Sequence, residues 1–399
     1  MNMLSIHKNN NATIGLRNGV ETAISYGNLD ESYRAVRKNI LLSDYSHFGI
    51  AQVKGDSAWE LCNLLVSGDV SSIRDEQALY TLILDEEGKI DCDLYVAYDD
   101  ERFLLISEWK TGEELANMAQ DLHAKHAEDI EDIDEISSLT PEWGMLHFEG
   151  PYAWELLSLV YGMDVIGLPF QEHMHVSDEL ILLRSGKHGE FSYKLLGPQA
   201  ELVEVWESMI EQGADYDMVV GGLDVQSVIR VENPCWQPEV FNPFSRCPIE
   251  LQMQWAVRYD KETFQGFDAL IEKTEAPVVK RAIGIMFGEE VKQKVASHTP
   301  IYHNESKIGE VIISEFSPDL EKVIGRAMFD NDFAWAEIDD YTVMIDGKHI
   351  GLQTSAIPFA RNFSFLVNPS EHSYVDKTRP SNLIEQLEWQ KQKEQQEQG

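Results

Sequence analysis

A strand that ends in glycine and runs directly into a helix occurs twice in the chain, and this repetition limits the folds that the sequence can adopt. The alternating segment 49–55 ends in glycine and precedes a helical pattern that Asp56 can cap. Segment 144–150 also ends in glycine and precedes a second helical pattern. We therefore predict two related αβ halves, at residues 1–135 and 136–272.

The pattern changes after about residue 273, where the helical periodicity stops. Short apolar runs separated by glycine and polar residues then predict strands over 279–287, 308–313, 322–329 and 341–345. Such a series is typical of a small β-barrel, which we place at residues 273–370. The remaining residues, 371–399, form a charged tail with a predicted surface helix over 381–398. The predicted class is therefore α+β with a C-terminal barrel.

The charge of the chain excludes two classes of partner. The 399 residues hold 32 Lys plus Arg against 69 Asp plus Glu, a formal net charge of −37. Nucleic acids and anionic membrane surfaces both require basic residues to displace counterions, so neither is an expected partner. A hydrophobic content of 43% supports packed cores and argues against a disordered acidic protein. A cationic partner or a salt-adapted host would each explain the excess of acids.

Targeting and metal signals are weak. Residues 1–14 lack the apolar core of a signal peptide, and no apolar run reaches the roughly 18 residues needed to span a bilayer. The four cysteines show no paired spacing, so we expect reduced thiols and a soluble cytoplasmic protein. His173 and His175 share a strand face without a suitably spaced acidic or cysteine partner. We predict no metal site.

Two acids mark a candidate catalytic strand. Asp91 and Asp93 follow the turn at Gly88 and, two residues apart, point to the same face of a strand. In a cleft, such a carboxylate can act as an acid, a base or a stabiliser of positive charge. Acids beside a turn are more often solvent-exposed, and the pattern alone does not decide between these interpretations.

Motifs in a fixed order from about residue 26 to 365 resemble those of a known family. They are YGNLDESYRAVR at 26–37, SDYSHF at 43–48, GKIDCDLYV at 88–96, FEGP at 148–151, RSG at 184–186, WAVRYDK at 255–261, FQG at 264–266 and SPDLEKVIG at 317–325. Together they are similar to the tetrahydrofolate-dependent aminomethyltransferases, a family that includes the glycine-cleavage T-protein, dimethylsulfoniopropionate demethylase and the methyl-accepting domains of dimethylglycine and sarcosine oxidising enzymes.

The resemblance implies a three-domain, ring-like fold that binds tetrahydrofolate in a central channel and transfers a one-carbon unit to the pterin nitrogen. Asp93 falls at the place of the family's catalytic aspartate, where a carboxylate can stabilise a developing cation. Cys92 replaces the first acid of the pair and is interpreted as a small buried residue. The implied folate-binding residues are Tyr80, Asp93, Glu108, Arg184, Lys194, Arg230 and Trp255. Further aromatic candidates for the channel wall are Tyr95, Trp109, Phe170 and Trp236.

Several positions depart from the family pattern. Lys194 replaces the glutamate that accepts hydrogen bonds from the pterin edge, and an ammonium can only donate. Glu108 replaces an asparagine. Gln226 replaces an arginine that meets the folate tail, although Arg230 keeps the pattern four residues on. These changes favour a paralogue with a changed substrate or an altered folate pose.

The basic residues of one hairpin, Arg184, Lys187 and Lys194, are predicted to bind an anionic group, either a substrate carboxylate or the folate tail. The competing interpretation is that they are exposed lysines and an arginine that aid solubility. An acidic lipoyl carrier protein is not expected to bind a surface of this charge.

Two functions remain in contention. The first is a demethylase-like transfer of a methyl or aminomethyl group from a small soluble amine, sulfonium or methyl ether to tetrahydrofolate. The second is a non-catalytic or folate-independent subunit on the same scaffold, with a homo-oligomer or larger complex forming through the C-terminal helix.

Overall fold

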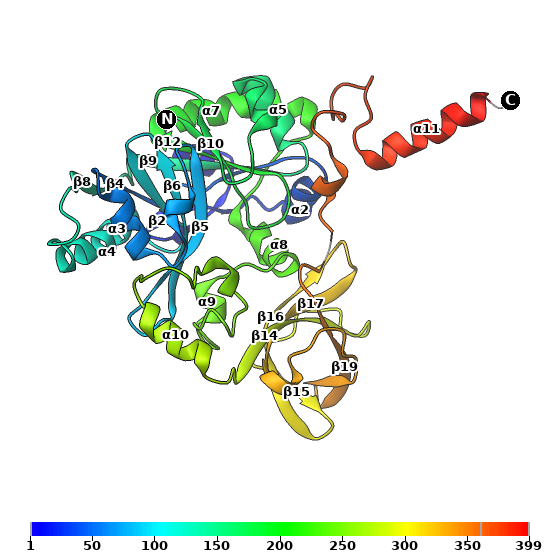
Figure 1. The fold of residues 1–399 in the computed structure, drawn as a ribbon. Helices are drawn as coiled ribbons and strands as arrows, with labels where there is room; N and C mark the ends of the chain where they lie inside the picture. The colour runs from blue at the N-terminus through cyan, green and yellow to red at the C-terminus, as the bar shows by residue number, and fades with distance from the viewer. Residues whose placement is uncertain (1, 360, 398–399) are drawn as a thin grey trace. The chain divides into compact units, whose positions relative to one another are not determined.

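The computed structural model describes residues 2–359 and 361–397, which divide into two compact units. Unit 1 combines residues 1–48, 140–225 and 361–399, and unit 2 combines residues 49–139 and 226–360. Each unit is therefore assembled from separate stretches of chain, which differ in colour in Figure 1. The domain limits 1–135, 136–272, 273–370 and 371–399 stay predictions.

Unit 1 is built around a six-stranded sheet of order β10-β11-β12-β9-β3-β13, beside the two-stranded hairpin β1-β2. Its strands are β1 (Thr13–Arg17), β2 (Val20–Ser25), β3 (Leu41–Asp44), β9 (Trp143–Glu149), β10 (His173–His175), β11 (Ile181–Arg184), β12 (Ser192–Pro198) and β13 (Val219–Val220). Its helices are α1 (Met3–Asn9), α2 (Leu29–Lys38), α5 (Ala153–Tyr161), α6 (Asp164–Gly167), α7 (Gln199–Gln212) and α11 (Leu383–Glu397), with short 3-10 helices at Gly213–Tyr216, Leu223–Val225 and Phe363–Leu366.

The core of unit 1 lies on one face of this sheet. Leu42, Phe148 and Tyr193 come from three neighbouring strands and pack with Trp154 of α5 and Trp206 of α7. Alternation along each strand sends these residues to the core and their neighbours to the opposite face. That opposite face carries the polar residues described below.

Unit 2 contains a five-stranded antiparallel sheet of order β5-β6-β7-β4-β8 and a closed six-stranded barrel. The sheet strands are β4 (Gly49–Lys54), β5 (Gln77–Leu84), β6 (Ile90–Asp99), β7 (Arg102–Ser107) and β8 (Glu135–Ser138). The barrel strands are β14 (Lys280–Phe287), β15 (Pro300–His303), β16 (Ser306–Ser317), β17 (Lys322–Asp330), β18 (Tyr341–Ile345) and β19 (Lys348–Ser355). The helices are α3 (Ala58–Leu65), α4 (Gly112–Lys125), α8 (Gln226–Glu232), α9 (Pro238–Phe241) and α10 (Phe267–Glu275), with short 3-10 helices at Val70–Ser72, Gln254–Ala256 and Asn331–Phe333.

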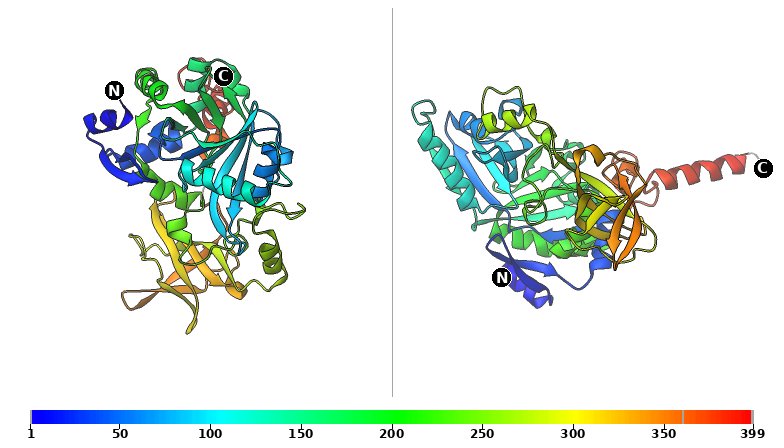
Figure 2. Two further views of the ribbon diagram at one scale, coloured as in Figure 1. Left: turned by 90° about the vertical axis from the view of Figure 1, so that its left-hand side faces the viewer. Right: turned by 90° about the horizontal axis from the view of Figure 1, so that it is seen from below.

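The barrel confirms the class predicted from the sequence, and Figure 2 shows its strands from two sides. Ile285, Val311 and Phe329 are among the apolar side chains that fill it. The barrel was predicted from short strands separated by glycine-containing turns, because such strands can form a sheet that closes on itself. The strands β15 and β19, which complete the barrel, were not predicted.

Most predicted helices form with small shifts at their ends. Helix α4 spans Gly112–Lys125 and begins with a capping box, in which Thr111 and Glu114 satisfy each other's backbone amides. The predicted cap Asp56 is wrong by one residue, because α3 begins after Ser57. The tail helix α11 spans 383–397, and the predicted end at Gln398 lies outside the described residues.

Candidate active site

Asp93 is buried in the middle of β6, beside Tyr80 of the neighbouring strand β5. In the antiparallel pair, Tyr80 lies opposite Tyr95 and Leu82 opposite Asp93, so these four side chains share one face of the sheet. The Tyr80 hydroxyl donates to Asp93 Oδ2 at 2.6 Å. The Ser107 hydroxyl donates to the Asp93 carbonyl oxygen at 2.8 Å. Side chain and backbone of Asp93 are therefore both held from the neighbouring strands.

Tyr80 acts as a neutral donor to this carboxylate. Burial raises the pKa of Tyr80 well above its ordinary value, and the negative charge and hydrogen bond of Asp93 raise it further. The phenol therefore keeps its proton over the whole physiological range. A hydrogen bond to an ionised oxygen is stronger than one between neutral groups, so Tyr80 fixes the orientation of Asp93.

An exposed aromatic side chain packs on Tyr80, the hydrogen-bond partner of this carboxylate. Trp255 stacks on Tyr80 with ring centroids 5.4 Å apart and planes 16° from parallel, while the indole is 67% exposed. Its short helical turn is fixed by the loop after α3, where Ser67 donates to the Ala256 carbonyl at 3.2 Å and accepts from the Arg258 amide at 2.8 Å. The geometry presents a flat indole for stacking beside Asp93.

Lys261 secures the same segment to the end of α3. Its ammonium donates to the carbonyl oxygens of Asn63, Val66 and Gly68 at distances between 2.5 and 2.8 Å. Carbonyls at a helix C-terminus carry partial negative charge and lack helical partners, which suits a cation there. Burial lowers the pKa of Lys261 to about 8. The lysine of the 255–261 motif is thus a positioning residue for Trp255.

Glu108 lies on the same face as Asp93. Tyr95 pairs with Ile106 of the antiparallel strand β7. Continuing this register by two residues along each strand places Glu108 opposite Asp93 and on the same face of the sheet. The ion pair between Asp91 and Lys110, at 3.1 Å, fits the same extension. Glu108 also contacts Arg230 Nη2 of α8 at 2.6 Å, and both side chains are buried. Two predicted folate-binding residues therefore bind each other.

Two tryptophans adjoin this ion pair. The Arg230 guanidinium lies 5.5 Å from the centroid of the Trp109 ring, and Trp109 meets Trp236 edge to face at 6.4 Å. Both indole Nε1 atoms are buried and have no hydrogen-bond partner among the described residues. Leaving a buried donor unsatisfied costs about 1–3 kcal/mol. A ligand that accepts from these donors would recover that cost.

The polar face of the sheet in unit 1 holds Lys194. The strand register aligns Ser43, His147 and Lys194 in one row across β3, β9 and β12. Lys194 is only 3% exposed, and its ammonium donates to the Ser185 carbonyl at 2.7 Å and to the Ser185 hydroxyl at 3.2 Å. The alternative interpretation of Lys194 as an exposed solubilising lysine is wrong, because the side chain points into a covered polar face.

Arg184 does not join Lys194. On β11 and β12 Leu183 pairs with Lys194 and Arg184 with Tyr193, so Arg184 and Lys194 point to opposite faces of the sheet. Arg184 donates to the Leu168 carbonyl and lies over the Phe191 ring. The expectation of one basic cluster on this hairpin is therefore wrong for these two residues, since only alternation, and not closeness in sequence, brings side chains together.

A buried acid missed by the sequence reasoning lies on the Lys194 face. His188 Nδ1 contacts Glu149 Oε1 at 3.0 Å, and His147 bonds Ser192 at 2.6 Å. Burial alone would raise the pKa of Glu149, but His188, His147 and Arg37 together lower it to about 2. The sequence could have indicated this acid, because Met145, His147 and Glu149 alternate along one strand and therefore share a face.

The remaining predicted residues are scattered. Phe170 lies in unit 1 and is 58% exposed. His173 is buried and His175 exposed, and the described part of the chain holds no group of three or more metal-ligating side chains close enough to share an ion. Within the described ranges, every helix is too short or too polar to cross a membrane.

Comparison with known protein families assigns the chain to one family. Residues 3–261 match the model of the GCVT N-terminal domain, and residues 280–360 match the glycine cleavage T-protein C-terminal barrel domain. These matches span more than half of the chain. The protein belongs to the tetrahydrofolate-dependent aminomethyltransferase family.

Individual relatives agree with this assignment. An aminomethyltransferase from Thermoanaerobacter pseudethanolicus is 28% identical over 340 residues, covering 83% of this chain and 89% of the relative. One from Lysinibacillus sphaericus is 28% identical over 350 residues, covering 86% and 92%. The crystal structure of the glycine cleavage system aminomethyltransferase T from Bartonella henselae matches with a TM-score of 0.75 at 22% identity, covering 90% of this chain and 97% of that one. The last likeness concerns the fold.

Proposed function

We propose that the protein transfers a methyl or aminomethyl group from a small soluble amine, sulfonium or methyl ether to tetrahydrofolate. The observation that carries this proposal is the buried Asp93 carboxylate, oriented by the Tyr80 phenol beside the exposed face of Trp255. An ionised group in a partly desolvated site stabilises nearby positive charge far better than it would in water.

The residues of unit 2 fit tetrahydrofolate. A flat heteroaromatic ring can stack on Trp255, and oxygen acceptors of the ligand can pair with the buried Nε1 atoms of Trp109 and Trp236. Glu108 and Arg230 cancel each other's charge, so this wall of the site is electrically neutral. Asp93 contributes the negative charge.

Tetrahydrofolate, when bound, supplies the ring nitrogen that receives the one-carbon unit. Asp93 stabilises the positive charge that develops while the unit is transferred, and it can hold a proton released from the attacking amine. Tyr80 keeps the carboxylate oriented without giving up its own proton, because its pKa is raised by burial and by Asp93. Trp255 excludes water from one side of the reacting atoms.

Lys194 supports a donor that carries a carboxylate. A buried ammonium offers donors only, and it recognises carboxylate or carbonyl oxygens. Glutamate at this position, which the family resemblance implies, would instead select a partner rich in N–H groups. We therefore infer that Lys194 binds an anionic group, either a substrate carboxylate or the folate tail, and the net charge of −37 favours a free small donor over an acidic carrier protein.

The experiment is a transfer assay with purified full-length protein, tetrahydrofolate and a panel of methylated amino acids, carboxylated sulfonium compounds and aryl methyl ethers. Mass spectrometry detects a one-carbon adduct of tetrahydrofolate. The proposal predicts adduct formation with a carboxylate-bearing donor and none with the same donor after esterification. If tetrahydrofolate binds but no donor in the panel reacts, a non-catalytic subunit becomes the better description.

A further inference from the structure

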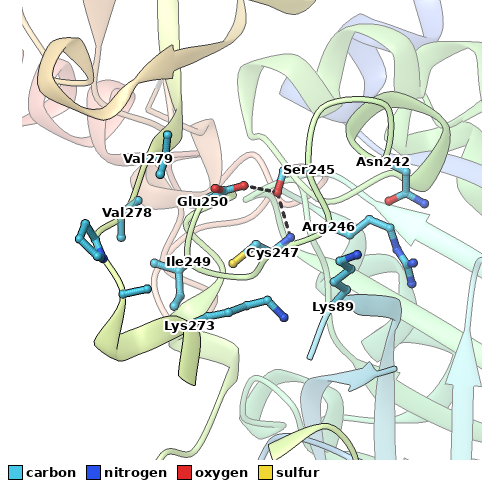
Figure 3. A pocket seen from close by; sticks show the side chains of 12 residues that line it. Lys89, Asn242, Ser245, Arg246, Cys247, Ile249, Glu250, Lys273, Val278 and Val279 are labelled. Carbon is cyan, nitrogen blue, oxygen red and sulfur yellow. Dashed lines mark hydrogen bonds between the residues drawn. The ribbon is translucent and has the colours of Figure 1, made fainter. Parts of the chain in front are cut away.

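A pocket in unit 2, separate from the Asp93 cluster, lies at the start of the strand that carries Asp93. The cavity measures about 450 Å³, is open to solvent and is bordered by the turn before β6, the segment 242–250, the end of α10 and the connection into β14. Figure 3 shows Lys89 and Arg246 on one side of it, with the amino group of Lys273 pointing toward them. None of these residues contributes to the Asp93 cluster.

The pocket is cationic in a strongly acidic protein. Its lining holds three basic side chains, Lys89, Arg246 and Lys273, and one acid, Glu250. The Ser245 hydroxyl donates to Glu250 Oε2 at 2.6 Å, which holds that carboxylate at the far wall from the basic groups in Figure 3. In a chain with 32 basic and 69 acidic residues, a lining with an excess of cations is a local reversal of charge.

Two acids outside the lining form ion pairs with two of these cations, so that together with Glu250 the three bases are formally balanced by three acids. Asp85 contacts Arg246 Nη2 at 2.9 Å, and Glu87 contacts the Lys89 ammonium at 2.5 Å. Arg246 Nη1 has no partner among the described residues, and within the same residues Lys273 donates only to the Glu87 carbonyl and forms no ion pair. Donors therefore remain for a ligand.

The opposite wall is apolar. Ile249, Ala276, Pro277, Val278 and Val279 line it, and the Cys247 side chain lies between this wall and the basic groups in Figure 3. A ligand that fills the cavity must therefore combine negative charge at one end with an apolar body at the other. A bare inorganic anion would leave the apolar wall in contact with water.

The pocket is coupled to the catalytic strand through the backbone. The Ile90 amide donates to the Arg246 carbonyl at 2.8 Å, and Arg246 Nε donates to the Ile90 carbonyl at 2.9 Å. Ile90 is the first residue of β6 and Asp93 the fourth, so the two sites share one rigid strand. About three residues of strand correspond to roughly 10 Å.

We propose that this pocket binds a carboxylate attached to an apolar body. Two sources share that chemistry: the aminobenzoyl-glutamate tail of folate and a free aromatic or aliphatic acid. The first source rests on the proposed function, whereas the pocket itself does not. Carboxylate oxygens pair with Arg246 and the two ammonium groups, and the apolar body packs against Ile249 and Val278.

The test is calorimetric titration of full-length protein with p-aminobenzoyl-L-glutamate, its triglutamate form and benzoate. We expect saturable binding that weakens about tenfold in Lys89→Gln/Lys273→Gln, the size expected when two partly exposed charge contacts are removed. The matched control Lys292→Gln/Lys348→Gln removes two exposed lysines, one in the connection between β14 and β15 and one at the start of β19, and should bind as the unchanged protein does. Tighter binding of the triglutamate assigns the pocket to the folate tail, and equal binding of benzoate assigns it to a free acid.

Alkylation of Cys247 locates the bound probe. Saturating probe should slow the reaction of Cys247 with iodoacetamide, read by peptide mass spectrometry, while the partly exposed Cys235 serves as the internal reference. No saturable binding of any probe, equal affinity in the double variant, or an unchanged Cys247 rate would each overturn the proposal. Asp93→Asn should bind the probes normally, so a failure of catalysis and a failure of this pocket remain distinguishable.

Discussion

The two sheets of the molecule each present a buried polar face, and the faces differ in the role of their acids. On the sheet of unit 2, Asp93 accepts from the neutral Tyr80 beside an exposed indole. In unit 1, Glu149 of β9 contacts His188, and Glu190 of the loop before β12 contacts Arg37 at 3.0 Å, so both acids are paired with cationic or protonatable groups. The comparison teaches that Asp93 of unit 2 faces a neutral donor while the acids of unit 1 face cationic or protonatable groups, a difference that supports the proposal of Asp93 as the catalytic acid.

The largest expected effect is on catalysis in unit 2. Asp93→Asn keeps the shape of the side chain and removes its charge, so transfer should fall by about a thousandfold or more, as for the loss of a central electrostatic group. The control is Asp91→Asn on the same strand, whose carboxylate is bound to Lys110. An equal loss of the single-turnover rate in Asp93→Asn and Asp91→Asn would contradict the specific role of the Asp93 charge.

The next effect concerns stability in unit 1. The pKa of Glu149 is lowered to about 2, so its ionised form stabilises the fold above the ordinary pKa of 4.5, and this contribution disappears as the pH falls toward 2. Glu149→Gln should therefore reduce the free energy of unfolding by about 3 kcal/mol at pH 7 and by much less near pH 3.

Urea denaturation at both pH values measures this difference. Glu142→Gln, which changes an exposed acid nearby, is the control. A loss of stability that does not depend on pH would show that packing, and not the charge of Glu149, is responsible.

Tyr80→Phe tests the orientation of Asp93. Removing a hydrogen bond to an ionised group costs about 1.5–3 kcal/mol, so kcat should fall by about tenfold or more while the fold is retained. Tyr98→Phe on the same sheet is the control, since Tyr98 stacks on Phe103 away from Asp93. An unchanged kcat in Tyr80→Phe would show that Tyr80 contributes packing and that its hydrogen bond to Asp93 does not affect catalysis.

Lys194→Met tests the proposal that Lys194 binds a carboxylate. The KM of a carboxylate-bearing donor should rise about tenfold with little change in kcat, because a uniform binding contact to a charged group is lost. Lys187→Met on the same hairpin serves as the control. If instead tetrahydrofolate affinity falls and the donor KM stays constant, Lys194 contacts the folate and the assignment to the donor is wrong.

The smallest expected effect is on stacking. Trp255→Ala should raise the Kd of tetrahydrofolate about threefold to tenfold, in line with aromatic pair energies of about 0.5–1.5 kcal/mol. Trp335→Ala, an exposed tryptophan in the barrel segment, should leave the Kd unchanged. Fluorescence titration reads both variants, and equal Kd values for Trp255→Ala and the unchanged protein would remove the indole from the site.

The sequence predicted those parts of the site that depend on local periodicity. Alternation placed Asp91 and Asp93 on one face, and the family resemblance selected Asp93 and Tyr80, which the structure brings to 2.6 Å. Glycine-punctuated strands predicted the barrel. Local patterns are reliable here because strand alternation is set by backbone geometry alone.

The missed features depend on pairings between distant residues. Nothing local indicates that Arg230 meets Glu108, 122 residues away, or that β3 pairs with β9 across about 100 residues. The burial of Lys194 could not be read either, since alternation shows which residues share a face but not which face is covered. Long-range topology decides both.

The most direct test of the central claim is calorimetric titration of tetrahydrofolate into full-length protein, repeated with Asp93→Asn and Trp255→Ala. We predict saturable one-to-one binding that survives Asp93→Asn, because that carboxylate acts on developing charge, and that weakens in Trp255→Ala. No saturable heat with the unchanged protein at millimolar ligand would contradict the assignment of the Asp93 face as the folate site.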